Sequence, residues 1–192
     1  MDIKNAAKRS AVIIVILVLS IIIGFAYQHI WHNIDLKNHP REYSEYVEKY
    51  AADYGVPEYI VYAVIHEKSS FQSNKLSDDG RIGLMQISPD TLNWLTSLTK
   101  EELDPGILYD PDTNIKYGTY MLSYLFTKYG RWNAVLAAYE VGTSTVDLWM
   151  KDTDNLDVNG NLVKIPEKTT SSTVAEIEKT MDVYYKLYYK EK

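Results

Sequence analysis

The chain has 192 residues, a formal net charge of −6 and no cysteine. The lack of cysteine excludes disulfides and cysteine-ligated zinc, and the acidic charge argues against nucleic acid as a partner, because nucleic-acid-binding proteins carry clustered lysine and arginine. The four histidines lack the spacing of a metal site, so we expect no metal and no cofactor. The length fits one domain with a short additional segment.

An uncharged apolar run covers residues 11–27. It is near the lower limit of the length that a helix needs to span the hydrocarbon core of a bilayer. Tyr27 and Trp31 supply rings of the kind found at membrane interfaces. A cleavable signal peptide is the alternative, but the run is long for one and no clear small-residue cleavage site closes it. We therefore predict a single transmembrane helix over residues 11–30.

Positive charge is unevenly distributed around this run. Three cationic residues precede it: Lys4, Lys8 and Arg9. The next lysine, Lys37, lies well beyond it. The positive-inside rule therefore predicts a cytoplasmic N-terminus over residues 1–10, with the rest of the chain on the outer side of the membrane. We expect a linker over residues 31–42 and one domain over residues 43–192.

Helix start and stop signals divide the domain. Gly55-Val-Pro57 combines a helix end with the start of the next helix, which we expect over residues 57–66. Ser88-Pro89 and Asp110-Pro111 each place a capping residue before a proline, which is typical of a helix start. Gly130 is expected to end the helix that begins after Asp110.

The second half of the domain is also helical in pattern. An alanine-rich apolar stretch predicts a short helix over residues 133–141. Apolar residues recur at helical spacing from Val174 to Leu187, which predicts a final helix. Residues 151–172 read as a polar loop with a turn at Asn159-Gly160. No sustained strand alternation is present, so the fold class is all-α, with about six or seven short helices.

Several short motifs follow one another in a fixed order between residues 56 and 190. They are Ser69-Ser-Phe71, Gly80-Arg-Ile-Gly83-Leu-Met-Gln86, Asp110-Pro-Asp-Thr-Asn-Ile115, Ala137-Ala-Tyr139 with Gly142, and Ile165-Pro166. Together they resemble the catalytic domain of the soluble lytic transglycosylases, which have a goose-lysozyme-like fold and cleave peptidoglycan. The resemblance implies a lysozyme-like helical domain in a bacterial cell envelope, with peptidoglycan glycan strands as the partner.

The resemblance also shows that the catalytic motif is altered. In the family, one glutamic acid protonates the glycosidic oxygen, and its carboxylate then takes the proton of the muramic acid C6 hydroxyl, which gives a 1,6-anhydro product. Counting back from Gly83 by the family spacing places that glutamic acid at Lys68. Lysine has a reference pKa of about 10.4 and is a poor acid toward an ether oxygen. Catalysis is therefore expected to be impaired or lost.

Two neighbouring acids are candidates for a relocated catalytic group. Glu67 precedes Lys68, but one step along a helix turns a side chain by about 100°, so Glu67 should point away from the cleft. Glu140 stands where the family has the asparagine of Ala-Tyr-Asn-Ala-Gly. Because one position gained a cation and the other an anion, we expect Lys68 and Glu140 to form an ion pair across the former catalytic cleft.

The resemblance assigns sugar-binding roles to Ser77, Gln86 and Tyr139, and each has a structural alternative. Ser77 could cap a loop, Gln86 could satisfy backbone groups, and Tyr139 could pack in the core. After Ile165-Pro166 the family has a glutamate, an arginine and a tyrosine. In this chain the corresponding residues are Thr169, Ser171 and Thr173.

Three functions follow from these patterns. The first is a membrane-anchored pseudoenzyme that binds glycan strands or acts as a scaffold, with a cell-wall protein as a further partner. The second is an active lytic transglycosylase that uses Glu67 or Glu140 as its acid. In the third, the Lys68 and Glu140 pair closes the groove, and tyrosine-rich helices at residues 43–54 and 184–189 contact other proteins.

Overall fold

The computed structural model describes the backbone of residues 3–190, and the side chains of residue 13 and residues 16–190. The chain forms two compact units, Met1–Pro40 and Arg41–Lys192. The cytoplasmic segment predicted over residues 1–10 lies partly outside the described residues, and its location stays a prediction.

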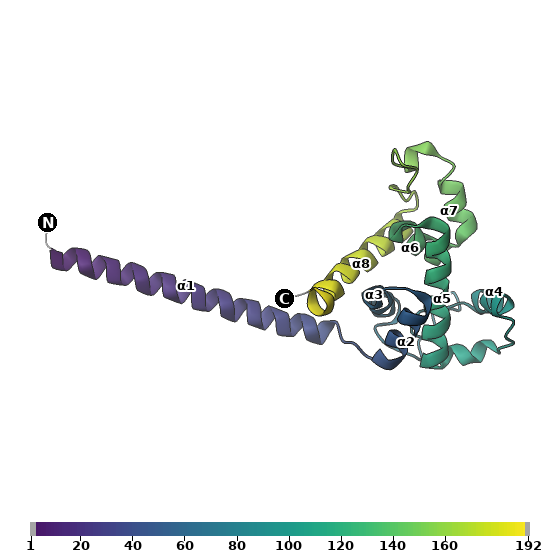
Figure 1. The fold of residues 1–192 in the computed structure, drawn as a ribbon, viewed down its shortest axis with the longest axis horizontal. Helices are drawn as coiled ribbons and strands as arrows, with labels where there is room; N and C mark the ends of the chain where they lie inside the picture. The colour runs from purple at the N-terminus through teal and green to yellow at the C-terminus, as the bar shows by residue number, and fades with distance from the viewer. Residues whose placement is uncertain (1–2, 191–192) are drawn as a thin grey trace. The chain divides into compact units, whose positions relative to one another are not determined.

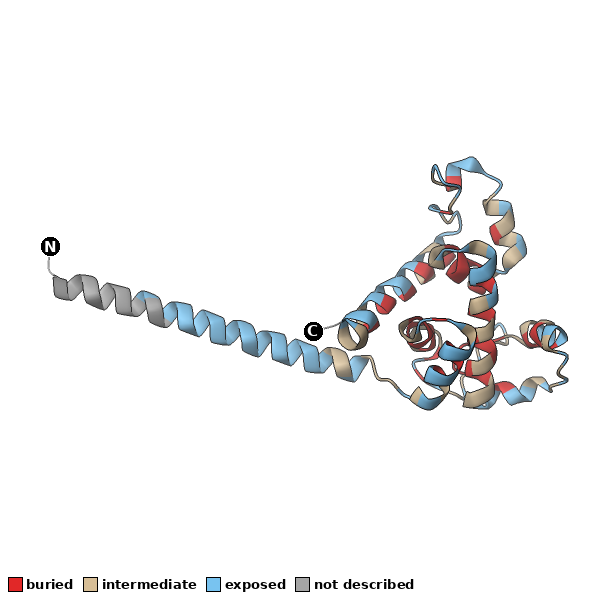
Figure 2. Cartoon of the chain, viewed as in Figure 1, coloured by how far each residue is buried: buried red, intermediate tan, exposed pale blue. Residues whose placement is uncertain are grey.

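The first unit is one helix, α1 (Ile3–Asn38). Its apolar side chains that the structure describes from residue 13 to residue 34 are exposed (Figure 2), and the segment Ile16–Asn38 is long and apolar enough to cross a membrane. The helix continues through residues 31–38, where we expected part of a linker. This stretch contains neither glycine nor proline, and the helix ends shortly before Pro40, which disfavours helical geometry in the residue before it.

The second unit is built from helices (Figure 1). Its α-helices are α2 (Ser44–Tyr54), α3 (Glu58–Ser69), α4 (Pro89–Thr99), α5 (Pro111–Tyr129), α6 (Trp132–Val141), α7 (Thr143–Trp149) and α8 (Lys168–Tyr184). Short helical turns lie at η1 (Pro105–Tyr109), η2 (Thr153–Asn155) and η3 (Tyr185–Tyr189). The described residues contain isolated β-bridges but no strand. The predicted all-α class is therefore confirmed.

Helix α3 lies in the core of this unit. It is apolar on every side, and residues 61–65 have no exposed surface (Figure 2). A helix with that pattern must be covered all round, and α2 and α8 both pack against it. Helix α8 also packs against α6. The burial of α3 fixes its C-terminal end, which carries Lys68, relative to α6 and α8.

The predicted helix starts are confirmed by their capping bonds. Ser88 Oγ accepts a hydrogen bond from the Thr91 amide at 3.1 Å, at the start of α4. The Asp110 carboxylate accepts one from the Thr113 amide at 2.9 Å, at the start of α5. Gly130 ends α5 with φ 68°. In each case the boundary agrees with the capping or backbone preference of a single residue.

Three boundaries differ from the predictions. The helix expected over residues 57–66 continues to Ser69, because left-handed backbone is first reached at Ser70, with φ 50°. Helix α7 was not expected. The loop predicted over residues 151–172 ends earlier, since α8 begins at Lys168. The threonines and serines of residues 169–173 favoured a loop in the sequence, but tertiary packing on α3 and α6 stabilises a helix there.

The tyrosines near the C-terminus largely pack within the domain. Tyr184 is fully buried and stacks on Tyr62, with ring centroids 5.5 Å apart. Tyr189 donates a hydrogen bond to the Glu58 carboxylate at 2.7 Å, and its ring lies 5.5 Å from the Arg41 guanidinium carbon. Tyr185 is 45% exposed. These contacts give most of the tyrosines a packing role in holding the two ends of the domain together.

Candidate functional site

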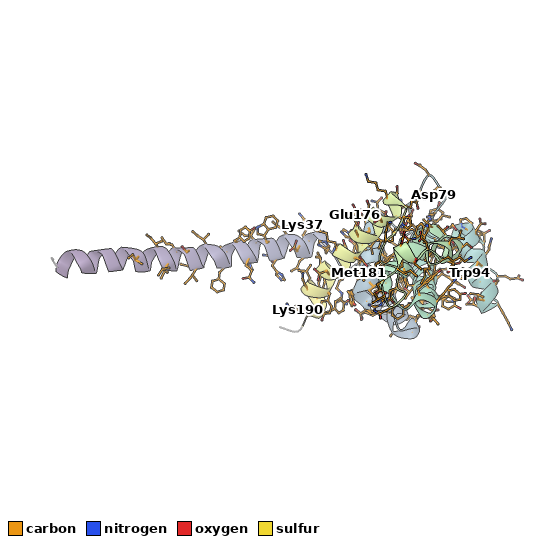
Figure 3. All side chains as sticks on the ribbon, turned by 90° about the horizontal axis from the view of Figure 1, so that it is seen from above. Lys37, Asp79, Trp94, Glu176, Met181 and Lys190 are labelled. Carbon is orange, nitrogen blue, oxygen red and sulfur yellow. The ribbon has the colours of Figure 1, made fainter. Side chains whose placement is uncertain are left out.

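The C-terminal ends of α3 and α6 contribute residues to one pocket of about 340 Å³. Its cations are Lys68, Lys75 and Arg81. Its acids are Glu67, Asp79, Glu140 and Glu176. Its neutral polar residues are Ser77, Gln86 and Thr173. Figure 3 shows Asp79 and Glu176 on the same side of the domain. Five of the six residues singled out in the sequence therefore lie together, and Tyr139 is the exception.

Lys68 and Glu140 form the ion pair expected from the sequence. Lys68 Nζ donates to Glu140 Oε2 at 2.6 Å and lies 2.5 Å from Oε1. Each side chain is only 13% exposed, so water screens the pair weakly. The positive charge of Lys68 is thus neutralised by the negative charge of Glu140.

Two further cations donate hydrogen bonds to the backbone carbonyls of Lys68 and Glu140. Lys75 Nζ donates to the Lys68 carbonyl at 2.5 Å, and Arg81 Nη2 donates to the Glu140 carbonyl at 2.7 Å. Both carbonyls lie in the last turn of a helix, where carbonyls lack intrahelical partners and carry partial negative charge. The loop after α3 therefore caps both helix ends and fixes the backbone beneath the ion pair.

A glycine and an asparagine fix the course of this loop. Gly83 has φ 78°, and a Cβ there would collide with the Asn114 amide and the Leu108 carbonyl. The Asn114 side chain donates to the carbonyls of Ile82 and Leu108, at 2.9 and 2.8 Å, and accepts from the Met85 amide at 2.8 Å. Two of the sequence motifs thus form one structural unit that holds the loop in place.

Glu67 also lines the pocket, so the expectation that it would point away was wrong. The pocket extends from the last turn of α3 to α8, so both Lys68 and the residue before it, Glu67, line it. Glu67 Oε1 accepts a hydrogen bond from the Thr180 hydroxyl at 2.6 Å and lies 3.0 Å from His66 Nδ1. One oxygen of this carboxylate is therefore held toward α8.

Ser77 and Gln86 hold the loop as well as lining the pocket. Ser77 Oγ accepts from the Arg81 amide at 2.9 Å, which is the loop-capping role considered from the sequence. Gln86 Nε2 donates to the Gly83 carbonyl at 2.7 Å and to the Lys75 carbonyl at 3.2 Å. Both side chains thus form hydrogen bonds with the backbone of the loop. A ligand in the pocket would therefore meet side chains that are already fixed in position.

Tyr139 does not line the pocket. It is 4% exposed, and its hydroxyl donates to the Met85 carbonyl at 2.8 Å. Burial, with the nearby Glu140 charge, raises the pKa of Tyr139 well above its ordinary value. The phenol therefore stays protonated and acts as a fixed donor within the core.

Four lining residues were not found from the sequence as candidates: Lys75, Asp79, Arg81 and Glu176. Arg81 lies within the motif Gly80-Arg-Ile-Gly83-Leu-Met-Gln86, and this position in a motif could have indicated it as a site residue. The pKa of Asp79 is held below its ordinary value by the hydrogen bond from Ser77 and by Arg81, whose Nε lies 2.9 Å away. Among the described residues, no group of three or more histidines and acids is placed to hold a metal ion.

A sequence profile described as "Transglycosylase SLT domain" matches residues 45–161. The chain belongs to this family. Helix α8 begins after the matched segment. Within α8, Thr169, Ser171 and Thr173 stand at the positions where the family resemblance predicted a glutamate, an arginine and a tyrosine. Thr173 lines the pocket.

Relatives of the SLT domain include soluble and membrane-bound proteins. The soluble lytic murein transglycosylase of Escherichia coli K12 is 27% identical over 164 residues, which are 83% of this chain and 25% of the relative. The membrane-bound lytic murein transglycosylase C of Yersinia pestis (strain Pestoides F) is 34% identical over 131 residues, which are 66% of this chain and 36% of the relative. This chain thus spans about a quarter to a third of these relatives.

Solved structures of the SLT family confirm the predicted lysozyme-like fold. The 70 kDa soluble lytic transglycosylase of E. coli superimposes with a TM-score of 0.72 at 26% identity, covering 79% of this chain and 25% of that one. An inactive mutant of lytic transglycosylase Slt from Pseudomonas aeruginosa, with one glutamate replaced by glutamine, gives 0.69 at 26% identity, covering 77% and 24%.

Proposed function

We propose that this SLT-domain protein is a membrane-anchored pseudoenzyme that binds peptidoglycan glycan strands without cutting them. The observation that carries this proposal is the residue at the family's catalytic position. Lys68 stands there and bonds to Glu140 at 2.6 Å. The two groups that a ligand would meet first at this position are thus an ammonium and a carboxylate already engaged with each other.

The chemistry of the pair is unsuited to glycoside cleavage. A general acid must release a proton to the leaving oxygen at working pH, and efficiency is greatest when its pKa is near that pH. Lys68 Nζ instead already donates to Glu140 at 2.6 Å, so it is not free to donate to a glycosidic oxygen. The inactive P. aeruginosa variant supports the same reasoning, since that protein lacks activity when one glutamate becomes a glutamine.

Active catalysis with a relocated acid is the alternative. Both candidates line the pocket, but each carboxylate has partners: Lys68 for Glu140, and Thr180 with His66 for Glu67. Because each carboxylate is already engaged with neighbouring side chains, neither is free to approach a glycosidic oxygen without breaking these bonds. This arrangement favours binding over cleavage.

The membrane location is part of the proposal. Helix α1 supplies an apolar segment, and the Yersinia relative is described as membrane-bound. With three cations before the apolar run, the N-terminus lies in the cytoplasm and the SLT domain on the outer side of a bacterial cell membrane. There the domain meets glycan strands, and a cell-wall protein could be recruited as a scaffold partner.

The test uses the full chain in detergent with purified peptidoglycan. Co-sedimentation measures binding, and mass spectrometry of the supernatant measures 1,6-anhydro muropeptides. We expect binding with no anhydro product. The variants Glu67→Gln and Glu140→Gln address the alternative, because anhydro product from the unaltered chain that either substitution abolishes would overturn the pseudoenzyme proposal. Product that first arises in Lys68→Glu would support it.

A further inference from the structure

We propose that the pocket recognises the charged stem peptide carried by a glycan strand rather than the sugar rings themselves. This inference rests on the proposed function and identifies the chemistry of the group that the pocket binds. It follows from the charges that remain after the pocket's internal pairs are accounted for.

The pocket lacks the side chains that usually bind sugar rings. Small-molecule sites are lined mainly by hydrophobic and aromatic residues, with a few polar groups. Among the described residues, none of the ten that line this pocket is aromatic, and seven of them are charged. The family resemblance predicted a tyrosine where Thr173 stands. A lining of this kind matches a charged ligand better than the apolar face of a pyranose.

Most of these charges are already engaged within the protein. Lys68 pairs with Glu140 at 2.6 Å, and Arg81 pairs with Asp79 at 2.9 Å. Glu67 is held by Thr180 and His66, as described above. These groups shape the pocket, but a ligand gains little from charges that already have partners.

Besides Glu67, whose Oε1 is held by the Thr180 hydroxyl and lies beside His66, two charges of opposite sign remain without an ion pair among the described residues. Lys75 bonds to the backbone carbonyl of Lys68 and pairs with no carboxylate among the described residues. Glu176 is exposed, and no described residue forms a hydrogen bond or ion pair with it. Lys75 comes from the loop after α3, whereas Glu176 comes from α8. The uncompensated cation and anion therefore stand on different elements of one pocket.

A ligand that satisfies both must carry a carboxylate and an ammonium. The carboxylate would bind Lys75, whose ammonium has three donors, and the ligand ammonium would bind Glu176. On peptidoglycan this combination is found in an un-cross-linked stem peptide, which has free carboxylates and, on a diamino acid, a free amino group. A glycan strand stripped of its peptides has no ammonium of this kind.

The experiment compares three ligands with the full chain in detergent: intact peptidoglycan, the same material after amidase removal of its peptides, and the released stem peptide. We expect the chain to bind intact peptidoglycan and the free peptide, and to bind stripped glycan at least tenfold more weakly. Equal binding of intact and stripped material would overturn this inference and leave the proposed function standing. Binding of neither material would overturn both.

A matched pair of variants tests the residues. Glu176→Gln removes the uncompensated anion, whereas Glu178→Gln makes the same change on the same helix at a residue that lines a different pocket. We expect Glu176→Gln to weaken binding of the stem peptide roughly two- to fivefold, the range for an exposed ion pair. Equal effects of the two substitutions would contradict the assignment. Thermal unfolding of both variants controls for loss of structure.

Discussion

Lys68 and Glu140 are 72 positions apart in the sequence, and their charged groups meet at 2.6 Å in the pocket. Each lies in the last turn of its helix, where the helix dipole is negative. That field stabilises the lysine and disfavours the glutamate, so the pair depends on direct contact. The loop cations at Lys75 and Arg81 offset the same field by bonding the two backbone carbonyls.

The pair should contribute to stability in a way that a double-mutant cycle detects. In the isolated domain, residues 41–192, Lys68→Met leaves Glu140 largely buried without its cation. Because an unpaired buried charge is costly, we expect a loss of about 2 kcal/mol in the free energy of unfolding. Glu140→Met should cost a similar amount by leaving the ammonium unpaired. Urea denaturation at neutral pH gives both values.

The double variant Lys68→Met/Glu140→Met decides whether the losses come from the pair. Two apolar side chains in contact leave no unpaired charge, so we expect the double variant to lose only about 1 kcal/mol, which corresponds to a coupling energy of about 3 kcal/mol. Additive losses would show that the two residues act independently. Lys179→Met, an exposed lysine on α8, controls for the general effect of removing a cation.

The sequence predicted those parts of the fold that depend on local chemistry. The starts of α4 and α5 follow from Ser88 and Asp110, whose side chains bond amides within the next three residues. The end of α5 follows from Gly130, which adopts left-handed backbone. The start of α8 did not follow, because its first turns are rich in threonine and serine and are stabilised by contacts distant in sequence.

In the candidate site, too, the residues found from the sequence are those with a local signal, and the one that was missed reaches the pocket through tertiary packing. Lys68, Glu140, Ser77 and Gln86 were found because they occupy motif positions, and they line one pocket. Glu176 was missed because nothing in the local sequence indicates that this face of α8 closes the pocket. Residues that meet through tertiary packing leave no local signal, whereas residues within a motif are identified by their spacing.

The close approach at Gly83 gives a second prediction. Both Gly83 and Gly80 have positive φ, 78° and 80°, so alanine at either position pays the penalty of left-handed backbone, about 1 to 2 kcal/mol. A Cβ at Gly80 meets nothing within 4 Å, whereas one at Gly83 collides with Asn114 and Leu108. We expect Gly83→Ala to destabilise the domain by at least about 2 kcal/mol more than Gly80→Ala. Equal urea midpoints for the two variants would contradict this.

Glu101 gives a prediction for acidic pH. Its pKa is lowered, first by the hydrogen bond from Lys116 at 2.9 Å and then by that from Tyr117 at 2.8 Å. A carboxyl with a lowered pKa in the folded state contributes stability above its unfolded pKa of about 4.3, and this contribution is lost as pH falls through the folded pKa.

The stability difference between the unaltered domain and Glu101→Gln should therefore shrink as pH falls from 6 to about 2.5. Urea denaturation across this range measures it. Glu102→Gln is the matched control, because Glu102 is exposed and no described residue forms an ion pair with it. A difference that stays constant for Glu101→Gln would show that its bonds to Lys116 and Tyr117 do not favour the charged carboxylate.

Placing an acid at position 68, where the family resemblance predicts one, should create a carboxylate pair. In Lys68→Glu, the new carboxyl lies against Glu140 at the negative end of α3, and two carboxylates in contact cannot both ionise without a large cost. The pKa of the pair is therefore raised in the folded state, so the stabilising form is the protonated one. Stability should be present near pH 4 and be lost as pH rises above about 4.3, the unfolded value.

The measurement is urea denaturation of the isolated domain at pH 4, 5.5 and 7, with Lys68→Gln as the uncharged control. Lys68→Glu should lose about 1 to 2 kcal/mol relative to that control between pH 4 and pH 7, which corresponds to a shift of roughly one pKa unit. Parallel curves for the two variants would mean that the introduced carboxyl turns away from Glu140. A raised pKa is also what a general acid requires, so the same pH dependence shows at which pH a carboxyl at position 68 is protonated.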